Sequence, residues 1–370
     1  MDLQRLAEQI KLWGNELGFQ KVGITDIDLS AHEAGLNKWL AQGYNGSMEW
    51  MERNGDKRVH PELLHPGTVR IISVRLDYLP PEAHFASNLS DSTQAYISRY
   101  ALGRDYHKLM RNKLKHLATK IEQEVGQLNY RPFVDSAPVL ERPLAEKAGL
   151  GWTGKHSLLL DEHAGSWFFL GELMVDLPLP VDKVIENQCG KCRSCITSCP
   201  TGAIVEEGVV DARKCISYLT IEYDGIIDKA LCDVMGNRIY GCDDCQLVCP
   251  FNRQAKITKQ ADFHRKETIK NSDLLHLFLW DESTFLKNFE GSAIRRIGYI
   301  QWLRNLSIAI GNSHYSEDVI NTLKTKLGLN DVLDHHINYA IERLTSQASS
   351  VSTKQQRLIR IVQKGLPRDA

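Results

Sequence analysis

The cysteines of this sequence are the residues whose type and spacing could do chemistry. All nine lie between Cys189 and Cys249, and the rest of the 370-residue chain has none. Disulfides that stabilise a whole fold would be spread along it, whereas a dense cluster is typical of metal ligands. The first group reads Cys189-x2-Cys192-x2-Cys195-x3-Cys199-Pro200. Thiolates at this spacing bind [4Fe–4S] clusters, which carry electrons.

A second group repeats the end of this pattern with its first cysteine missing. It reads Cys242-x2-Cys245-x3-Cys249-Pro250. The missing thiolate must come from Cys215 or Cys232. We favour Cys215, because residues 200–215 indicate a helix and a short hairpin that return to the cluster, as in two-cluster ferredoxins. In such proteins the last cysteine of each run binds the other cluster. One cluster then takes Cys189, Cys192, Cys195 and Cys249, the other takes Cys199, Cys215, Cys242 and Cys245, and Cys232 is left over.

Structural zinc is the alternative explanation for pairs of cysteines two residues apart. A four-cysteine zinc site uses two such pairs. It explains neither the third cysteine of the first group nor the two Cys-x3-Cys-Pro endings. The spacing therefore favours two iron–sulfur clusters, which conduct electrons but do not show what is reduced.

The segment before the cysteines alternates helix and strand patterns. Apolar runs at 21–25 and 69–74 predict short strands, and an apolar stripe at helical spacing predicts a helix over 105–125. Strands are also expected at 157–160 and 167–175, joined by the polar turn 161–165. The pattern predicts an α+β or α/β region large enough to hold a sizeable cofactor.

Helix dominates after about residue 270. Apolar helical patterns occupy 274–280, 298–312 and 332–344, and a short basic helix follows a stretch rich in Thr, Ser and Gln at 345–356. Helix pairs at this spacing indicate a short HEAT-like array that offers an extended binding surface. A plain helical cap on the iron–sulfur region fits the pattern equally well.

Composition and charge exclude several classes of protein. Hydrophobic residues make up 42% and charged residues 25%, which excludes collagen-like and mostly disordered chains. Residues 252–370 hold 18 basic and 12 acidic residues against 27 and 34 in residues 1–251, a split that hints at a polyanionic partner. No run approaches the roughly 20 apolar residues of a membrane span, and the N-terminal helix lacks a signal-peptide core. We expect a cytoplasmic protein without membrane contact.

One glycine motif is rejected. Gly149-Leu-Gly151-Trp-Thr-Gly154 matches a dinucleotide-binding motif letter for letter. That motif must follow a strand and open a helix. Here it follows a helical pattern at 143–148 and precedes the strand pattern at 157–160, so we expect no dinucleotide site.

The segment from Arg131 to Ser157 resembles the epoxyqueuosine reductase family. It reads RPFVDSAPVLERPLAEKAGLGWTGKHS. The cysteine pattern, the segment 215–222 and the motifs at 304–305 and 309–312 extend the resemblance over essentially the whole chain. The family implies a cobalamin-dependent oxidoreductase with two [4Fe–4S] clusters, related to reductive dehalogenases. Its reaction removes the epoxide oxygen from epoxyqueuosine at the wobble position of tRNA.

With this resemblance the expected fold is α+β and has three domains. An α/β cobalamin-binding catalytic domain would occupy residues 1–185, and a ferredoxin-like domain with two clusters residues 186–255. A helical HEAT-like domain that binds tRNA would occupy residues 256–370. The expected partners are tRNA carrying epoxyqueuosine and an external low-potential electron donor of the flavodoxin or ferredoxin type. We expect a monomer.

Asp135 is the residue we expect to give the proton that epoxide opening requires. It is the lone carboxyl of an apolar stretch, whose neighbours would raise its pKa and keep it protonated. A turn or a helix N-cap is its alternative role. We expect Glu141 and Glu146 to pair with Arg142 or Lys147, or to cap helices.

The resemblance also implies that cobalamin is held by polar contacts around the corrin rim, without a protein ligand to cobalt. The nominated residues are Arg58, Tyr100, Asp135, Lys155, His156, Ser157, Ser217, Thr220, Glu222 and Asp243. Packing against the 105–125 helix explains Tyr100 and Tyr106 equally well. Basic residues of the tail would follow tRNA phosphates, and we nominate Arg295, Arg296, Arg304, Lys324 and Lys326.

Two other functions compete. A corrinoid reductive dehalogenase of a small organohalide would be expected to carry a twin-arginine export signal, which the sequence lacks, and would not need a basic helical tail. A ferredoxin-like electron carrier would take up no corrinoid and would give Asp135 no role.

Overall fold

A four-stranded antiparallel sheet organises the N-terminal half of the molecule. In the computed structural model, which describes residues 2–346 and 352–366, the strand order is β1 (Lys21–Thr25), β2 (Arg70–Asp77), β7 (Phe168–Val175) and β4 (Tyr130–Phe133). In the β2–β7 register Ile71 lies opposite Met174, and Ile72 lies opposite Leu173. Because side chains alternate along a strand, these two pairs point to opposite faces, and both faces are buried.

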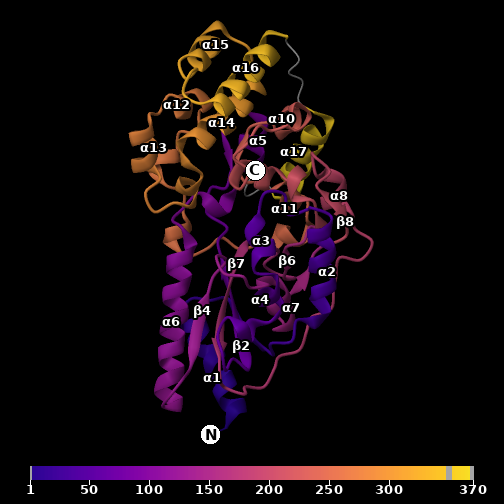
Figure 1. Cartoon of the computed structure of the whole chain (residues 1–370), viewed down its shortest axis with the longest axis vertical. Helices are drawn as coiled ribbons and strands as arrows, with labels where there is room; N and C mark the ends of the chain where they lie inside the picture. The colour runs from indigo at the N-terminus through magenta and orange to yellow at the C-terminus, as the bar shows by residue number, and fades with distance from the viewer. Residues whose placement is uncertain (1, 347–351, 367–370) are drawn as a thin grey trace.

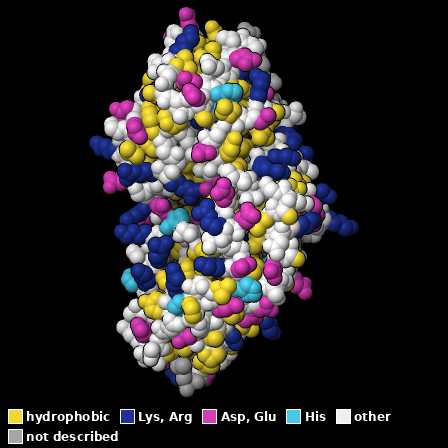
Figure 2. All heavy atoms as spheres, in the orientation of Figure 1, with side chains coloured by type: hydrophobic (Ala, Val, Ile, Leu, Met, Phe, Trp, Pro, Cys, Tyr) yellow, Lys and Arg dark blue, Asp and Glu magenta, His cyan; other side chains and the backbone are white. Residues whose placement is uncertain are grey.

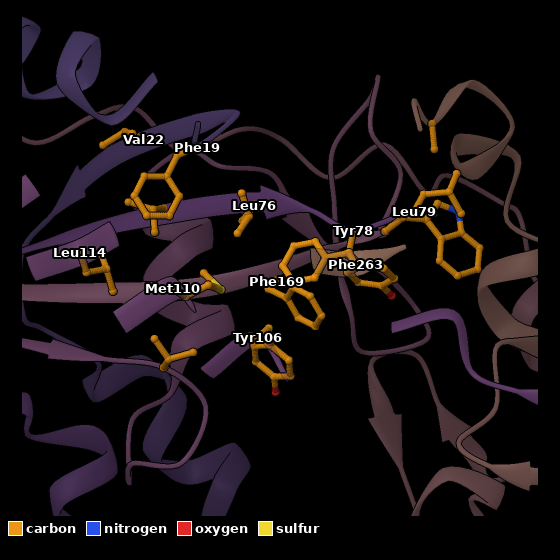
Figure 3. Packing of buried hydrophobic residues seen from close by; sticks show 14 of the residues in the cluster. Phe19, Val22, Leu76, Tyr78, Leu79, Tyr106, Met110, Leu114, Phe169 and Phe263 are labelled. Atoms are coloured by element: carbon orange, nitrogen blue, oxygen red, sulfur yellow. The ribbon is translucent and has the colours of Figure 1, made fainter. Parts of the chain in front are cut away.

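Two helices cover one face of the sheet. They are α1 (Leu3–Glu16) and α6 (Tyr106–Val125), which begin at the capping carboxylates of Asp2 and Asp105. The apolar stripe of α6 is fully buried against the sheet, and Figure 3 shows Met110 and Leu114 in this core. Each such side chain contributes about 1.5–3 kcal/mol through burial. The predicted helix over 105–125 is thus confirmed.

The opposite face is covered by α7 (Glu141–Lys147), which contacts β1, β2 and β7. Leu144 packs there with Ile71 and Met174. The helices α2 (Ser30–Ala41), α3 (Glu49–Arg53) and α4 (Gly55–Val59) follow β1 in the chain, and α5 (Phe85–Ser90) follows β2.

The predicted hairpin of strands 157–160 and 167–175 is wrong. The first strand, β6 (Leu159–Leu160), pairs with β5 (Trp152–Thr153), while β7 lies in the large sheet between β2 and β4. The turn itself forms, with a bridge between Asp161 and Gly165. The glycine motif lies between α7 and β6, in the order that excludes a dinucleotide site.

Short elements carry the cysteines. They are α8 (Ser194–Ser198), the hairpin β8 (Ile204–Glu206) and β9 (Val209–Val210), α9 (Ile216–Ile221), α10 (Lys229–Met235), β10 (Arg238–Tyr240) and α11 (Asp244–Leu247). β10 pairs in parallel with β3 (Tyr96–Ile97), which joins this segment to the N-terminal half. The helix expected at the start of 200–215 is absent, but the hairpin is present.

The helical region lies at the other end of the molecule (Figure 1). It contains α12 (Leu274–Phe278), α13 (Glu282–Asn288), α14 (Gly298–Gly311), α15 (Glu317–Lys324) and α16 (Asp331–Thr345). The central α14 packs along α16 and is buried from Trp302 to Gly311. Among the described residues, no helix is long and apolar enough to cross a membrane.

The last helix, α17 (Thr353–Gly365), leaves this helical region. It packs against α5 and α11, and Leu358 and Val362 are buried in the same core as the sheet. Figure 1 shows it beside the cysteine-bearing elements. The proposed boundaries at 185 and 255 stay a prediction. They assign the last helix to the helical domain, whereas its contacts are with α5 and α11 outside that domain.

Candidate active site

A cavity of about 490 Å³ lies where the three parts of the chain meet. The N-terminal half contributes Tyr100, Tyr106 and Phe169 to its wall, and the cysteine segment contributes the loops around α9 and α11. The helical region contributes Ala293 and Arg296 from a 3-10 helix at Ala293–Ile297. The volume lies within the range of small-molecule and cofactor sites.

Asp135 lies on this wall in a strained backbone conformation. The chain leaves β4 at Phe133, and Asp135 has φ +53°, a left-handed value that costs energy in a residue other than glycine. Its Oδ2 accepts a hydrogen bond from the Tyr106 hydroxyl at 2.6 Å and lies 3.2 Å from Nε2 of His107. The other ring nitrogen of His107 lies 2.6 Å from the Asp105 carboxylate. The carboxyl of Asp135 is thus held from α6 and remains half exposed toward the cavity.

The charges of these groups differ from our expectation. Burial raises the pKa of Asp135, but hydrogen bonds from His107 and Tyr106 and the charges of His107 and Arg296 outweigh it and lower the pKa below the usual value. Burial lowers the pKa of His107, yet its bonds to Asp105 and Asp135 raise it to about 9. The prediction that Asp135 is kept protonated by apolar neighbours is therefore wrong. At neutral pH the proton resides on His107.

Six of the residues nominated for cobalamin contact line the cavity. They are Tyr100, Asp135, His156, Ser157, Ser217 and Glu222. A second cavity of about 580 Å³ shares Ser157 and Val210 with the first in its lining.

Four nominated residues are absent from the lining of this cavity, which corrects the prediction: Arg58, Lys155, Thr220 and Asp243, the last of which was nominated for its backbone together with that of Cys242. Arg58 is buried and donates to the carbonyls of Trp50 and Met51. Lys155 pairs with Glu207 beside a smaller cavity. The other two, Thr220 and Asp243, are buried and form hydrogen bonds within the protein.

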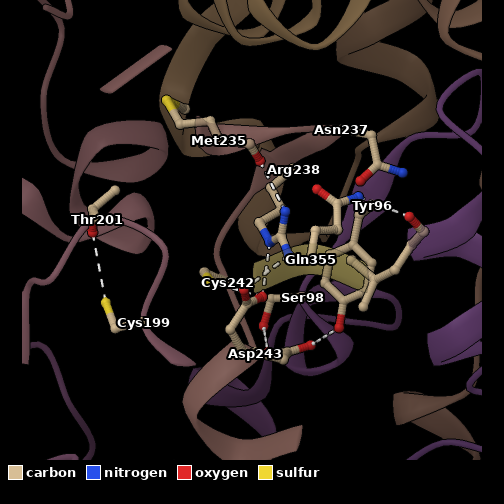
Figure 4. A network of polar contacts seen from close by, with 12 residues as sticks. Tyr96, Ser98, Cys199, Thr201, Met235, Asn237, Arg238, Cys242, Asp243 and Gln355 are labelled. Atoms are coloured by element: carbon tan, nitrogen blue, oxygen red, sulfur yellow. Dashed lines mark hydrogen bonds and ion pairs between the residues drawn. The ribbon is translucent and has the colours of Figure 1, made fainter. Parts of the chain in front are cut away.

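The side chains of Thr220 and Asp243 form hydrogen bonds with backbone groups and with neighbouring hydroxyls. The Thr220 hydroxyl donates to Ile216 and accepts from the amide of Gly241. The Asp243 carboxylate accepts hydrogen bonds from the Tyr96 and Ser98 hydroxyls, as Figure 4 shows. These bonds hold the loop that presents Cys242.

The thiols are distributed over two cavities. The smaller cavity is lined by Cys189, Cys192, Cys195 and Cys249, and the wall of the 490 Å³ cavity contains Cys199, Cys215, Cys242 and Cys245. These are the two sets expected from the crossed pattern. Cys232 lines neither and is buried in α10, where it donates to the carbonyl of Ile227.

Four thiols around each cavity fit the demands of two [4Fe–4S] clusters. Among the described residues, no three His, Cys, Asp or Glu side chains converge closely enough to hold a single metal ion.

The residues nominated for tRNA fall into different environments. Arg295, Arg296 and Lys324 are exposed, and Arg296 also lines the cavity and pairs with Glu222. Lys326 donates to the carbonyl of Trp280 and to Tyr299.

Arg304 is a correction to this set. It is fully buried and donates to the carbonyls of Leu219, Tyr223 and Gly225. It therefore cannot reach a phosphate, and its role is to join α14 to the segment after α9.

Sequence reasoning missed His107, the placement of Arg296 and the role of Glu141. Glu141 pairs with neither Arg142 nor Lys147 but accepts the backbone N–H of Asp135. The sequence does place His107 in the first turn of the helix expected over 105–125. Nothing local shows that this turn faces Asp135.

Comparisons with known proteins decide the family. A family model described as epoxyqueuosine reductase QueG, DUF1730 matches residues 58–136, and one described as a 4Fe-4S double cluster binding domain matches residues 188–252. The epoxyqueuosine reductase of Aliivibrio fischeri is 70% identical over 370 residues and covers both chains fully. That of Escherichia coli is 56% identical over 375 residues, covering 100% of this chain and 99% of the relative. The chain belongs to the epoxyqueuosine reductase family.

Solved structures of epoxyqueuosine reductases have the same fold. One, with an epoxyqueuosine-modified tRNA-Tyr stem loop, has a TM-score of 0.83 at 25% identity, with 100% of both chains covered. Another, from Bacillus subtilis, has its catalytic loop swung out of the active site. Its TM-score is 0.84 at 25% identity, and the match covers 99% of this chain and 100% of that one. Members of this family are oxidoreductases, which agrees with the enzyme class predicted from the sequence.

Proposed function

We propose that this chain reduces epoxyqueuosine to queuosine at the wobble position of tRNA, with cobalamin in the 490 Å³ cavity and two [4Fe–4S] clusters beside it. One observation carries the proposal. The proton-bearing set of Asp135, Tyr106 and His107 and the four thiols of one proposed cluster lie on the wall of the same cavity. Electrons and protons can therefore meet at one substrate.

The cavity wall fits a large polar cofactor at His156. Nδ1 of His156 accepts the amide of Leu158, so Nε2 carries the hydrogen, and burial lowers the pKa of this side chain to about 4. Within the described residues, Nε2 has no hydrogen-bond partner although it is buried. A cofactor amide or phosphate oxygen would satisfy this donor. Tyr100, Ser157, Ser217 and Glu222 line the same space and would add contacts.

Bound cobalamin would supply a redox-active cobalt to which the clusters deliver electrons. Converting an epoxide to an alkene consumes two electrons and two protons and releases the oxygen as water. The chain's own residues supply the protons. Asp135 presents its half-exposed carboxyl to the cavity, and His107 holds a proton 3.2 Å from it. Asp135 is ionised at rest and relays the proton of His107 to the departing oxygen, and the pair takes the second proton from solvent water.

The tRNA would lie over the mouth of the cavity with its wobble nucleotide unstacked. On the face shown in Figure 2, Lys and Arg side chains gather around the middle of the molecule, between the sheet and the helical region. Arg295 and Lys324 are exposed and suit phosphate contact. The proposal includes the HEAT-like nature of the helical region, a cytoplasmic location, an external low-potential donor and a monomeric state.

The test is anaerobic reconstitution of the protein with iron, sulfide and cobalamin, followed by turnover on tRNA carrying epoxyqueuosine. We expect two clusters and one corrinoid per chain. Asp135→Asn should lower kcat by about 10²–10⁴-fold, because general acid catalysis is lost, while iron and corrinoid contents stay unchanged. Full activity of this variant, or two clusters without corrinoid uptake, would contradict the proposal.

A further inference from the structure

A buried carboxyl without a cation lies behind Asp135. Glu172 is in the middle of β7 and has no exposed surface. In the sheet it lies opposite Ser73 of β2 and Phe133 of β4, neither of which is charged. In the part of the chain that the structure describes, its oxygens accept no hydrogen bond from an N–H group or a cation. An ionised carboxylate in this place would be strongly destabilised.

The group that faces Glu172 is another carboxyl. Glu141, the first residue of α7, is within hydrogen-bond reach of Glu172. Burial and the charge of Asp135 raise the pKa of Glu141 to about 7, although the bonds with the Asp135 amide and with Glu172 lower it. Burial and the neighbouring Glu141 raise the pKa of Glu172 well above its usual value. Two carboxyls can bond only if one carries a proton, so this pair holds a shared proton at and below neutral pH.

Glu141 also binds the loop that carries Asp135. Its Oε1 accepts the backbone N–H of Asp135 at 2.5 Å. Asp135 has φ +53° there, a conformation that costs on the order of 1–3 kcal/mol and persists only where other contacts hold it. The contact with Glu141 therefore restrains the backbone of this loop, on the side away from the cavity.

Other charged groups near the pair have partners of their own. His107 and Asp135 act on Glu141 from the cavity side. On the neighbouring strands, Lys21 of β1 and Arg75 of β2 pair with Asp161, and Arg131 of β4 donates to the carbonyl of Leu64. On α7, Lys147 pairs with Asp26, and the charges of Arg142 and Glu146 attract each other. No described cation binds Glu172 directly.

We propose that Glu141 and Glu172 form a proton-sharing latch that positions the Asp135 loop in the cavity. With the proton in place, Glu172 donates to Glu141, and Glu141 accepts the Asp135 amide. Loss of that proton places two negative charges in one buried site and releases the loop. Both are positioning residues, and the inference rests on the proposed role of Asp135. A relative from Bacillus subtilis is recorded with its catalytic loop swung out, which shows that such a loop has a second position in that protein.

The direction of the pH effect follows from the raised pKa values. A carboxyl whose folded pKa lies above its unfolded value favours the closed state at low pH. Glu141 loses its own proton as pH rises through about 7, and the shared proton, held by Glu172 with its still higher pKa, is lost above that pH. The latch should therefore open on the alkaline side.

Hydrogen exchange tests the latch without turnover. The purified protein is labelled at pH 5–9, and exchange of the peptide containing Asp135 is corrected for the intrinsic pH dependence. In the wild type, protection should fall by about tenfold at the alkaline end of this range, above pH 7, which is the loss of one hydrogen bond. Glu172→Gln, whose amide donates without titrating, should keep protection up to pH 9. Glu172→Met should lack protection at every pH.

Turnover provides the second readout. Glu172→Met should lower kcat by about tenfold with unchanged KM for tRNA, and Glu172→Gln should restore it. Glu146→Gln on the same helix, whose carboxylate accepts the Thr153 hydroxyl, is the matched control. Identical exchange profiles for wild type and Glu172→Gln would overturn the latch. Asp135→Asn separates the two proposals. It should lower kcat by about 10²–10⁴-fold, while protection still falls with rising pH, at a lower pH because the charge of Asp135 no longer raises the pKa of Glu141.

Discussion

At the scale of single residues, the position of the proton in this site is set by contacts across the fold. The stretch around Asp135 is apolar in sequence, and that pattern alone predicts a protonated carboxyl. In the structure the first turn of α6 brings Tyr106 and His107 to Asp135, and the proton moves to the imidazole. Asp135 could be chosen from the sequence because of the family resemblance. Its charge could not, because His107 lies far from it in the chain.

His107 should determine the alkaline limit of the reaction. Its raised pKa of about 9 means that it is protonated at neutral pH and loses that proton as pH rises through about 9. Wild-type kcat should fall over that range, whereas His107→Gln should have a lower kcat throughout and keep only the decline of about tenfold that opening of the Glu141–Glu172 latch causes. A pH profile of single-turnover rates checks this. An unchanged alkaline decline in the variant would assign it to another group.

The same titration should affect stability in a defined direction. Because the folded pKa of His107 lies above the unfolded value of about 6.5, its stabilising contribution is full below pH 6.5. The contribution is lost as pH rises through about 9. Thermal unfolding of wild type and His107→Gln should therefore differ at pH 6 and converge at pH 10. A constant difference across this range would contradict the assignment.

At the scale of elements, regular periodicity was the most informative signal. The apolar stripe of 105–125 predicted α6, and the cysteine spacing predicted two sets of thiols that the structure places around two cavities. The hairpin of 157–160 and 167–175 was wrong, because β7 pairs with strands far away in sequence and β6 pairs with β5. A local turn does not reveal such distant partners.

The loop before Cys242 should be the most sensitive of the cysteine loops. Gly241 has φ +69°, and a Cβ placed there would lie 2.6 Å from the Cβ of Ser98. Gly241→Ala should therefore displace Cys242 and lower the iron content by about half, the share of one of two clusters. Gly190 has φ +50° beside Cys189, with no atom within 4 Å of an added Cβ, and Gly190→Ala is the matched control. Equal iron contents in the two variants would contradict this prediction.

At the scale of the whole molecule, the basic surplus of residues 252–370 contains residues with different roles. Arg304 was counted among the tRNA contacts because sequence gives charge but not burial. Its guanidinium lies inside, where it binds three carbonyls and the side chain of Asn305. Lys324, by contrast, is exposed at the end of α15.

These two residues should respond differently to substitution. Arg304→Met should lower the free energy of unfolding by about 2–4 kcal/mol, because buried carbonyls lose their donors. It should leave the salt dependence of tRNA binding unchanged. Lys324→Gln should leave stability unchanged, weaken tRNA binding and reduce the slope of log Kd against log salt by about 0.7–1. Titrations at several salt concentrations check this, and a salt slope altered only by Arg304→Met would contradict it.

The return of α17 to the cysteine segment affects the order in which the protein is completed. Nζ of Lys354 donates to the carbonyl of Cys199, and Nε2 of Gln355 donates to the carbonyl of Leu89. Leu358 and Val362 close the core that also contains Cys195. During synthesis on the ribosome, these contacts form only after the end of the chain has emerged, at about 5–20 residues per second. Until then residues 189–249 lack the contacts of α17, and we expect iron and sulfide to be inserted before this helix has docked.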